Sequence, residues 1–222
     1  AQALSIRAFD YFVLAQMYQH TYKGNESKPC VPLITNENAN EAAANGCARS
    51  TVQEVYDQIM SDLNKAVSLL EATDKTRGTD KRYISKEVAY GLRARVNLTM
   101  QNWTAAAEDA QKAINGSGTP YSREEAGAPG FTESSDHSWM WAIVIAETDR
   151  VVTSGIVNFP SHMGSLNYGY ASVGAWRMIN KKLYNEIPDT DVRKGWWLDA
   201  NKHSDNLNAT QVAQATKYGC PA

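Results

Sequence analysis

The chain has 222 residues, of which 43% are hydrophobic and 21% are charged, and its formal net charge is −2. These fractions are typical of a globular protein, and the small net charge excludes a strong electrostatic attraction to nucleic acids or to anionic membrane surfaces. The six Trp and eleven Tyr residues are numerous enough to leave aromatic rings for a binding surface once the core is filled.

The chain opens with a pattern that predicts a helix over residues 3–22. This stretch is apolar on most sides, which is typical of a helix buried among others, and Gly24 is expected to end it. Residues 24–49 then predict a loop rich in Asn, Glu and Ala. Loops of this length are uncommon unless they are functional or mobile.

The second helix is expected to start after this loop. Ser50 or Thr51 can cap it, because Gln53 and Glu54 lie three residues further on in capping-box spacing. Apolar residues then recur at intervals of three and four, which predicts one buried face. They are Val52, Val55, Tyr56, Ile59, Leu63, Ala66, Val67 and Leu70.

Two further helices are predicted over residues 85–101 and 103–115, with Ser85 as the N-cap of the first. The very short turn between them indicates an αα-hairpin, and small residues at the contact positions resemble a tetratricopeptide repeat of about 34 residues. The expected fold class is therefore mainly α, built from tetratricopeptide-like helical hairpins. Trp103 and Trp176 lie on helix stripes and are expected in the core.

Glycine and proline break the helical periodicity after residue 116. A loop-rich region is expected here, with short strands at 139–146 and 151–159 and a helix at 173–186. The sequence thus predicts two domains. Residues 1–116 form helical repeats, and residues 117–222 form a ligand-presenting region that packs on them and is incomplete at its C-terminus.

The cysteines and charged clusters predict no metal site, no cofactor and no catalytic residue. Cys30, Cys47 and Cys220 have no CxxC spacing. Cys30 and Cys47 flank the polar loop, where they either form a disulfide in an oxidising compartment or remain free thiols.

Three groups of charged residues have both a functional and a structural interpretation. Asp189, Asp191 and Arg193 fit either a pair of catalytic carboxylates with an arginine clamp or a capped, charge-paired turn, and we favour the turn. Asp136 and His137 are interpreted as surface residues without acid–base or metal chemistry. Arginines within the apolar helices predict structural ion pairs or contacts with neighbouring repeats. These are Arg7, Arg93 and Arg95.

Four stretches, taken in order, resemble the SusD/RagB family of outer-membrane glycan-binding lipoproteins of Bacteroidetes. Residues 1–18 resemble its first aromatic-rich repeat helix, and residues 51–70 resemble the helix after its long loop. Residues 83–114 resemble its repeat pair, with Lys-x-x-Ala, Ala-Arg-Val and Asn-Trp-x-x-Ala elements. Residues 183–197 resemble its Asp-x-Asp-x-Arg stretch. They read AQALSIRAFDYFVLAQMY, TVQEVYDQIMSDLNKAVSLL, YISKEVAYGLRARVNLTMQNWTAAAEDAQKAI and LYNEIPDTDVRKGWW.

The resemblance implies a SusD-like α/α superhelix in a surface-exposed lipoprotein of the cell outer membrane. It implies non-catalytic binding of a polysaccharide or oligosaccharide, which is delivered to a TonB-dependent, SusC-like outer-membrane transporter. Family members are longer, so the chain is interpreted as a fragment that lacks the N-terminal and C-terminal parts. Its contact with the membrane is expected only through a lipid anchor outside this sequence.

The chemistry of sugars suggests which side chains would bind such a ligand. Aromatic rings stack on the apolar faces of a sugar, and polar groups bind its hydroxyls. Two tyrosines flank a glycine with polar neighbours, and two adjacent tryptophans follow a charged turn. The candidate ligand-binding residues are Tyr168, Tyr170, Trp196, Trp197, His162 and Asn167. Core packing is the alternative for each ring.

Two other classes of function remain open at this point. The first is a tetratricopeptide-like protein–protein interaction scaffold that binds no glycan. The second is a glycosidase, for which the sequence shows no established catalytic motif.

Overall fold

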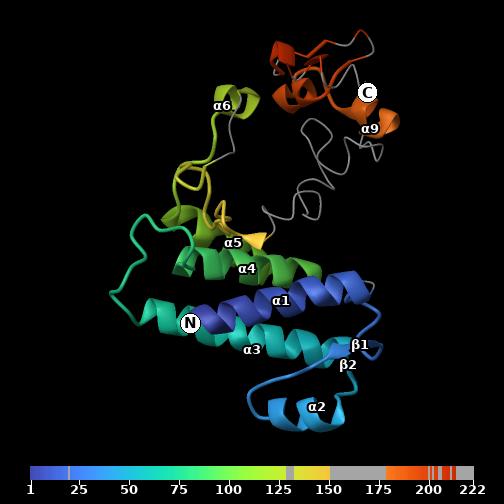
Figure 1. Cartoon of the computed structure of the whole chain (residues 1–222), viewed down its shortest axis with the longest axis vertical. Coiled ribbons are helices and arrows are strands. Elements are labelled where there is room, and N and C mark those ends of the chain that lie inside the picture. The colour runs from blue at the N-terminus through green and yellow to red at the C-terminus, as the bar shows by residue number, and fades with distance from the viewer. Residues whose placement is uncertain are drawn as a thin grey trace. The chain divides into compact units, whose positions relative to one another are not determined.

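The computed structural model describes residues 1–19, 21–128, 133–150, 179–199, 201, 203–204, 207–210 and 212–213. The chain divides into two compact units (Figure 1). The first unit consists of Ala1–Gly118 together with Trp139–Ala142, and the second consists of Thr119–Ser138 and Ile143–Ala222.

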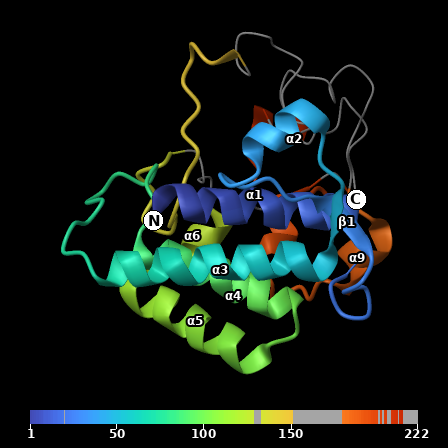
Figure 2. The ribbon, with the colours of Figure 1, turned by 90° about the horizontal axis from the view of Figure 1, so that it is seen from below.

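The first unit is an array of helix pairs. Helix α1 (Gln2–Tyr18) packs on α3 (Val52–Glu71), and α4 (Lys86–Thr99) packs on α5 (Trp103–Gly116). Because α3 also contacts α4, the two pairs form one continuous stack (Figures 1 and 2). The mainly helical fold class and the predicted helices are confirmed, although α1 ends at Tyr18 and not at residue 22.

Local capping explains where the helices begin. The Thr51 side chain accepts a hydrogen bond from the Glu54 amide, while the Glu54 carboxylate accepts from the Thr51 amide, so a complete capping box starts α3. The Ser85 side chain accepts from the Val88 amide and starts α4. Both caps were predicted from the sequence.

A Schellman motif closes the turn between α4 and α5. The amide of Asn102 donates to the Asn97 carbonyl at 2.9 Å, and the amide of Gln101 donates to the Leu98 carbonyl at 3.1 Å. Gln101 has a φ of 64°, in the left-handed region that glycine adopts at lower cost. This geometry explains how two helices are joined by so few residues.

Two ion pairs join the helices of this unit, as predicted for arginines in apolar helices. Arg7 of α1 donates two hydrogen bonds of 2.7 Å to Asp62 of α3. Arg93 of α4 donates two of 2.7 Å to Asp109 of α5 and a third, of 3.0 Å, to Asn64 of α3. Both carboxylates are buried.

The region between α1 and α3 is more ordered than the loop predicted over residues 24–49. It contains strand β1 (Pro29–Pro32), helix α2 (Ala39–Asn45) and strand β2 (Arg49–Thr51), with β1 antiparallel to β2. Arg49 adds side-chain hydrogen bonds to the carbonyls of Cys30 and Pro29. Short strands bounded by prolines lack the alternating pattern that would reveal them in a sequence.

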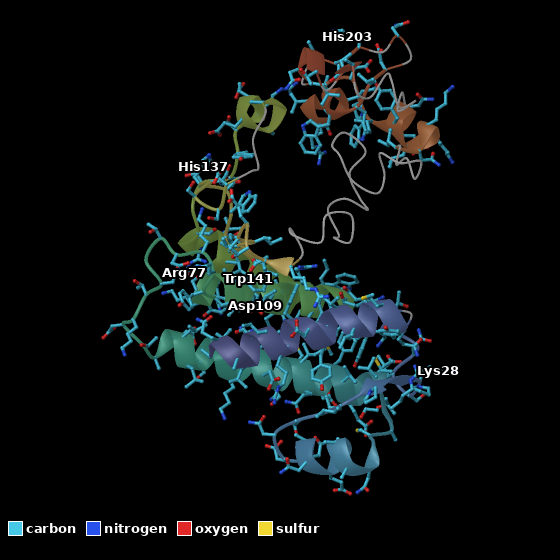
Figure 3. The ribbon with its side chains drawn as sticks, viewed as in Figure 1. Lys28, Arg77, Asp109, His137, Trp141 and His203 are labelled. Carbon is cyan, nitrogen blue, oxygen red and sulfur yellow. The ribbon has the colours of Figure 1, made fainter. Side chains whose placement is uncertain are left out.

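Residues 139–146 do not form the strand that the sequence predicted. Instead, Trp141 packs edge-on against Phe9 with ring centroids 5.3 Å apart. Trp141 is labelled in Figure 3. The Ala142 amide donates to the Lys81 carbonyl at 3.0 Å. The apolar run beyond it is exposed, with Ile143 at 75%. The segment therefore covers the helical core as an irregular strap.

Trp103 is a second correction, because it is 60% exposed at the start of α5 and not in the core. The described part of the chain places no helix against this face of α5. Trp176 and the predicted strand at 151–159 lie outside the described residues. Cys30 and Cys47 are free thiols in the structure, and Cys220 lies outside the described residues.

The second unit contains helix α6 (Arg123–Gly127), helix α9 (Lys181–Glu186) and the 3₁₀ helix η2 (Val192–Trp196). Helix α9 corresponds to the end of the helix predicted over 173–186. That prediction is wrong at Ile179 and Asn180, which are not helical, because Asn180 is the N-cap at which α9 begins. Residues 173–178 lie outside the described part. Among the described residues, no helix has the length and apolarity required to cross a membrane.

Removal of the buried Asp109 carboxylate should strongly destabilise the helical unit. We expect Asp109→Ala to lower the free energy of unfolding by about 3 kcal/mol, because the Arg93 guanidinium would be left buried without its partner. Glu108→Ala, at an exposed position of the same helix, should change it by less than about 0.5 kcal/mol. Urea unfolding followed by far-UV circular dichroism measures both, and equal effects would contradict the role of the ion pair.

A glycine at position 101, where the backbone is left-handed, should stabilise the helical unit. Gln101→Gly is expected to raise the free energy of unfolding by up to about 1 kcal/mol, because glycine adopts a positive φ without a steric penalty. Thr99→Gly, at a helical position of α4, should lower it by a similar amount. A loss of stability in Gln101→Gly under the same urea unfolding would show that this turn is not strained.

Candidate functional site

The second unit contains an open cavity of about 910 Å³. Its walls come from α6, from Tyr184 of α9 and from the segment that begins at Asp189. The lining residues are Arg123, Glu124, Gly127, Ala128, Tyr184, Asp189, Asp191, Val192, Lys194, Gly195, Trp197, Asp199, His203, Ser204, Leu207 and Asn208. Aromatic, charged and hydroxyl-bearing side chains therefore meet at one place.

The α6 wall is held by a capping box although the helix is short. The Glu125 amide donates to the Ser122 side chain at 3.2 Å, and the Ser122 amide donates to the Glu125 carboxylate at 2.8 Å. Trp196 adds a contact from η2, since its indole N–H donates to the Ala126 carbonyl at 3.0 Å. Helix α6 and η2 thus both contribute residues to the lining and are joined by this hydrogen bond.

His137, on the loop that follows α6, connects α6 to the backbone that precedes this helix. It is labelled in Figure 3. Its Nδ1 lies 2.8 Å from the Thr119 carbonyl oxygen, and its Nε2 lies 3.0 Å from the Glu125 carboxylate. Both neighbours are acceptors, so only the doubly protonated ring donates to both. The Thr119 carbonyl, and then Glu125, raise the pKa of His137 above its ordinary value.

The charged turn before η2 is the paired structure that the sequence favoured. Asp191 accepts hydrogen bonds from the backbone and side chain of Arg193, and these lower the pKa of Asp191 to about 2. Lys194 donates to Asp189 at 2.6 Å and to the Ile187 carbonyl at 3.0 Å. Its ammonium also lies 5.2 Å from the ring centre of Tyr184.

A second turn completes the cavity around Asp199. The Asp199 carboxylate accepts from the amides of Asn201 and His203, each at 2.8 Å. The hydrogen bond from the His203 amide is the main cause that lowers the pKa of Asp199. The Ser204 hydroxyl donates to the Gly195 carbonyl, which closes this turn onto η2.

The predicted tryptophan pair lies at this cavity. Trp197 is half-buried and lines it, whereas Trp196 is 46% exposed and borders it through its bond to α6. Their ring centroids are 6.1 Å apart, at an interplanar angle of 53°. The other predicted residues lie outside the described part of the chain. They are Tyr168, Tyr170, His162 and Asn167.

Sequence reasoning missed several lining residues. Tyr184 lies on α9, and nothing in the sequence marked it as a ligand-binding residue except that it is an aromatic residue shortly before Pro188. Residues of α6 are about 70 positions away in sequence from η2, and only the three-dimensional structure brings them together. The Ser122 and Glu125 spacing was the available sign, since it marks a capped helix start.

The cavity has the composition of a binding site for a polar ligand with apolar faces. The Trp197 ring supplies a flat apolar surface, and carboxylates, hydroxyls and amides surround it. Among the described residues, no cluster of His, Cys, Asp and Glu is arranged to hold a metal ion. The pKa of each lining aspartate is lowered, by Lys194 for Asp189, by Arg193 for Asp191 and by the His203 amide for Asp199.

Comparison with known proteins shows which proteins the helical part of the chain is similar to. Residues 1–98 match the family model SusD-like_3, described as "Starch-binding associating with outer membrane". A SusD-like carbohydrate binding protein from Bacteroides vulgatus has a similar structure, with 30% sequence identity and a TM-score of 0.56 over 63% of this chain. The first part of the chain is therefore similar to SusD-like proteins. The search of curated proteins found no match.

The similarity covers part of a longer SusD-like architecture. The chain spans 29% of the length of the B. vulgatus protein. A SusD superfamily protein from Bacteroides thetaiotaomicron is 28% identical over 57% of this chain and 27% of its own length, with a TM-score of 0.48. The family match over residues 1–98 includes α1, α3 and most of α4, and the residues that line the cavity lie beyond it.

The interaction of His137 with Glu125 of α6 predicts a raised pKa of His137 that can be measured. We expect the pKa of His137 to lie above the ordinary value of about 6.5, and Glu125→Gln should lower it because a carboxylate partner is lost. Glu124→Gln, at the neighbouring position of α6, should leave it unchanged. The ring Cε1–H chemical shift, followed by NMR against pH, reports each value.

The sign of the pH dependence follows from the raised pKa. The stabilisation from His137 should be complete below the unfolded-state pKa and should be lost as the pH rises through the folded-state pKa. A pKa of His137 at or below the ordinary value would contradict the hydrogen bonds of His137 to Thr119 and Glu125.

Proposed function

We propose that this SusD-like chain is part of a protein that binds a polysaccharide or oligosaccharide at the cell surface without catalysing a reaction. The observation that carries the proposal is the cavity in which Trp197 stands among hydrogen-bonding groups, in a chain whose helical repeats are SusD-like. The similar B. vulgatus structure is described as a carbohydrate binding protein, which supports the same ligand class.

The binding mode follows from the surfaces of a sugar. One apolar face would stack on Trp197, as sugars and other polar ligands do on flat rings in concave sites. The surrounding Ser204, Asn208 and carboxylate oxygens would exchange hydrogen bonds with the sugar hydroxyls. Tyr184 contributes its hydroxyl and ring edge, since the Lys194 ammonium lies over its ring.

Residues outside the described part complete the proposed ligand surface. We include Tyr168 and Tyr170 as stacking residues, with His162 and Asn167 as hydrogen-bonding partners, because aromatic rings beside glycine suit an exposed loop. These positions extend the proposal based on Trp197 and do not depend on the cavity geometry.

The absence of catalysis in the proposal is supported by the carboxylates of the cavity. Glycoside hydrolysis requires a carboxylic acid with a raised pKa to protonate the leaving group. The environments of Asp189, Asp191 and Asp199 all lower the pKa of these groups, so each stays ionised at neutral pH. None of these three aspartates would therefore supply the proton that cleavage of a bound sugar requires.

The place of this function in the cell is also a proposal. The matched family is described as associating with the outer membrane. We propose that the whole protein is a surface-exposed lipoprotein, attached by a lipid anchor, that passes its glycan to a SusC-like, TonB-dependent transporter. Co-purification with such a barrel would test this step separately from glycan binding.

A protein-binding scaffold is the second candidate function, and one observation favours it. An apolar groove of about 1170 Å³ runs along α1 and β1, with Ile6, Leu14, Tyr18 and Ile34 among its lining residues. Such a surface is suited to a partner helix or peptide. Capture of a transporter without any binding of glycans would favour this function over the first.

Substitution of Trp197 tests the glycan proposal directly. We expect Trp197→Ala to weaken binding by at least about tenfold, or about 1.4 kcal/mol, because the stacking surface is removed. Trp197→Phe should retain most of the affinity. Affinity electrophoresis in gels that contain a panel of polysaccharides measures the change.

Trp103→Ala serves as the matched control, since Trp103 is an exposed tryptophan on α5 in the other unit. Its binding should equal that of the unsubstituted chain. Unchanged binding in Trp197→Ala, and also in a variant with Tyr168→Ala and Tyr170→Ala, would overturn the site assignment. Failure of the unsubstituted chain to bind any glycan would overturn the proposed function itself.

A further inference from the structure

The charges of the cavity lining are unbalanced. Among the described residues that line it are four carboxylates, those of Glu124, Asp189, Asp191 and Asp199. The permanently positive side chains of the same lining are Arg123 and Lys194. A ligand that enters the cavity therefore meets more negative than positive groups.

The positive groups are also committed to partners within the protein. Lys194 donates to Asp189 and to the Ile187 carbonyl, and its side chain is only 22% exposed. Arg193, just outside the lining, donates to both oxygens of Asp191. The charge of Arg123 lowers the pKa of Asp191 further. A negatively charged ligand would have to compete with Asp189 for Lys194 and with Asp191 for Arg193.

The carboxylates cannot be neutralised easily to admit such a ligand. Each lining aspartate is held ionised by a fixed hydrogen-bond donor, namely Lys194, Arg193 or the His203 amide. Protonation would break or weaken these bonds. Neutral sugar hydroxyls, in contrast, donate well to ionised carboxylates, because hydrogen bonds to a charged acceptor are stronger than those between neutral groups.

We propose that this cavity selects uncharged glycans and rejects those that carry carboxylate or sulfate groups. The inference rests on the proposed glycan-binding function and names the ligand class of the same site. Like charges at short range repel most strongly where water is partly excluded. Rejection of acidic glycans is therefore expected to weaken as salt is added, whereas binding of neutral glycans is insensitive to salt.

The test uses the whole chain against two sets of polysaccharides. The neutral set contains starch, mannan, xylan and β-glucan, and the acidic set contains polygalacturonate, alginate, chondroitin sulfate and heparin. Binding to a neutral member, at least about tenfold tighter than to every acidic one, is the expected result. That ratio corresponds to about 1.4 kcal/mol.

Charge reversal at the cavity should relax this selectivity. Glu124 is exposed on α6 and lines the cavity, so Glu124→Lys is expected to strengthen binding of the acidic set by at least about threefold at low salt. Glu133→Lys makes the same charge change at an exposed position of the same unit that does not line the cavity. Glu133→Lys should leave the binding of both polysaccharide sets unchanged. Circular dichroism serves to check that both variants are folded.

The outcomes separate the two proposals. An acidic glycan that binds as tightly as, or tighter than, every neutral one would overturn the selectivity while the glycan-binding function stands. Equal gains in Glu124→Lys and Glu133→Lys would show a general charge effect and would also overturn it. No binding to either set would overturn the glycan-binding function, and this inference with it.

Discussion

The helical unit depends on two bidentate arginine–carboxylate pairs that connect helices across its core. Arg7 links α1 to α3 through Asp62, and Arg93 links α4 to α5 through Asp109 while also bonding Asn64 of α3. Apolar helix faces alone allow helices to slide, since hydrophobic packing is not directional. A planar guanidinium bound by two parallel hydrogen bonds fixes one position and one angle. The pairs therefore set the register of the stack, while contacts such as those of Phe12, Val55 and Ile59 supply most of the buried apolar area.

The described part of the second unit is organised differently, because α6, α9 and η2 are too short to bury much apolar surface. Its order comes from side chains that bond to backbone groups. Trp196 holds α6 through the Ala126 carbonyl, Asp191 and Asp199 each bind amides of the following turn, and His137 binds the Thr119 carbonyl. A site built in this way presents many polar groups at fixed positions, which suits recognition of hydroxyl-rich ligands.

The sequence predicted those parts of the fold that depend on local interactions. The starts of α3 and α4 follow from Thr51, Glu54 and Ser85, because a cap involves only residues three or four apart. Burial depends on neighbours that a sequence does not reveal. Trp103 was assigned to the core on its helix stripe, yet it is exposed. Residues 139–146 were read as a buried strand, yet only Ala142 of that run is fully buried, against the backbone of Lys81.

The candidate site was only partly predictable for the same reason. Trp197 stood out as one of two adjacent tryptophans after a charged turn, and the structure places it in the cavity lining. Glu124 and Tyr184 could not be grouped with it, because the cavity forms only when α6 and α9 approach η2. The charge pairing of Asp189 with Lys194 was also hidden, since the sequence pattern grouped Arg193 with the two aspartates and did not include Lys194.

The strap at Trp139–Ala142 means that the helical unit is discontinuous along the polypeptide. Phe9, in the first helix, contacts the Trp141 ring, and it loses this contact if the chain ends before residue 141. During synthesis, α1 to α5 would all have emerged by residue 118 but would still expose this seam until some two dozen more residues had followed. A truncated protein that stops at the end of α5 would keep α1 to α5 and still lack part of their covering layer.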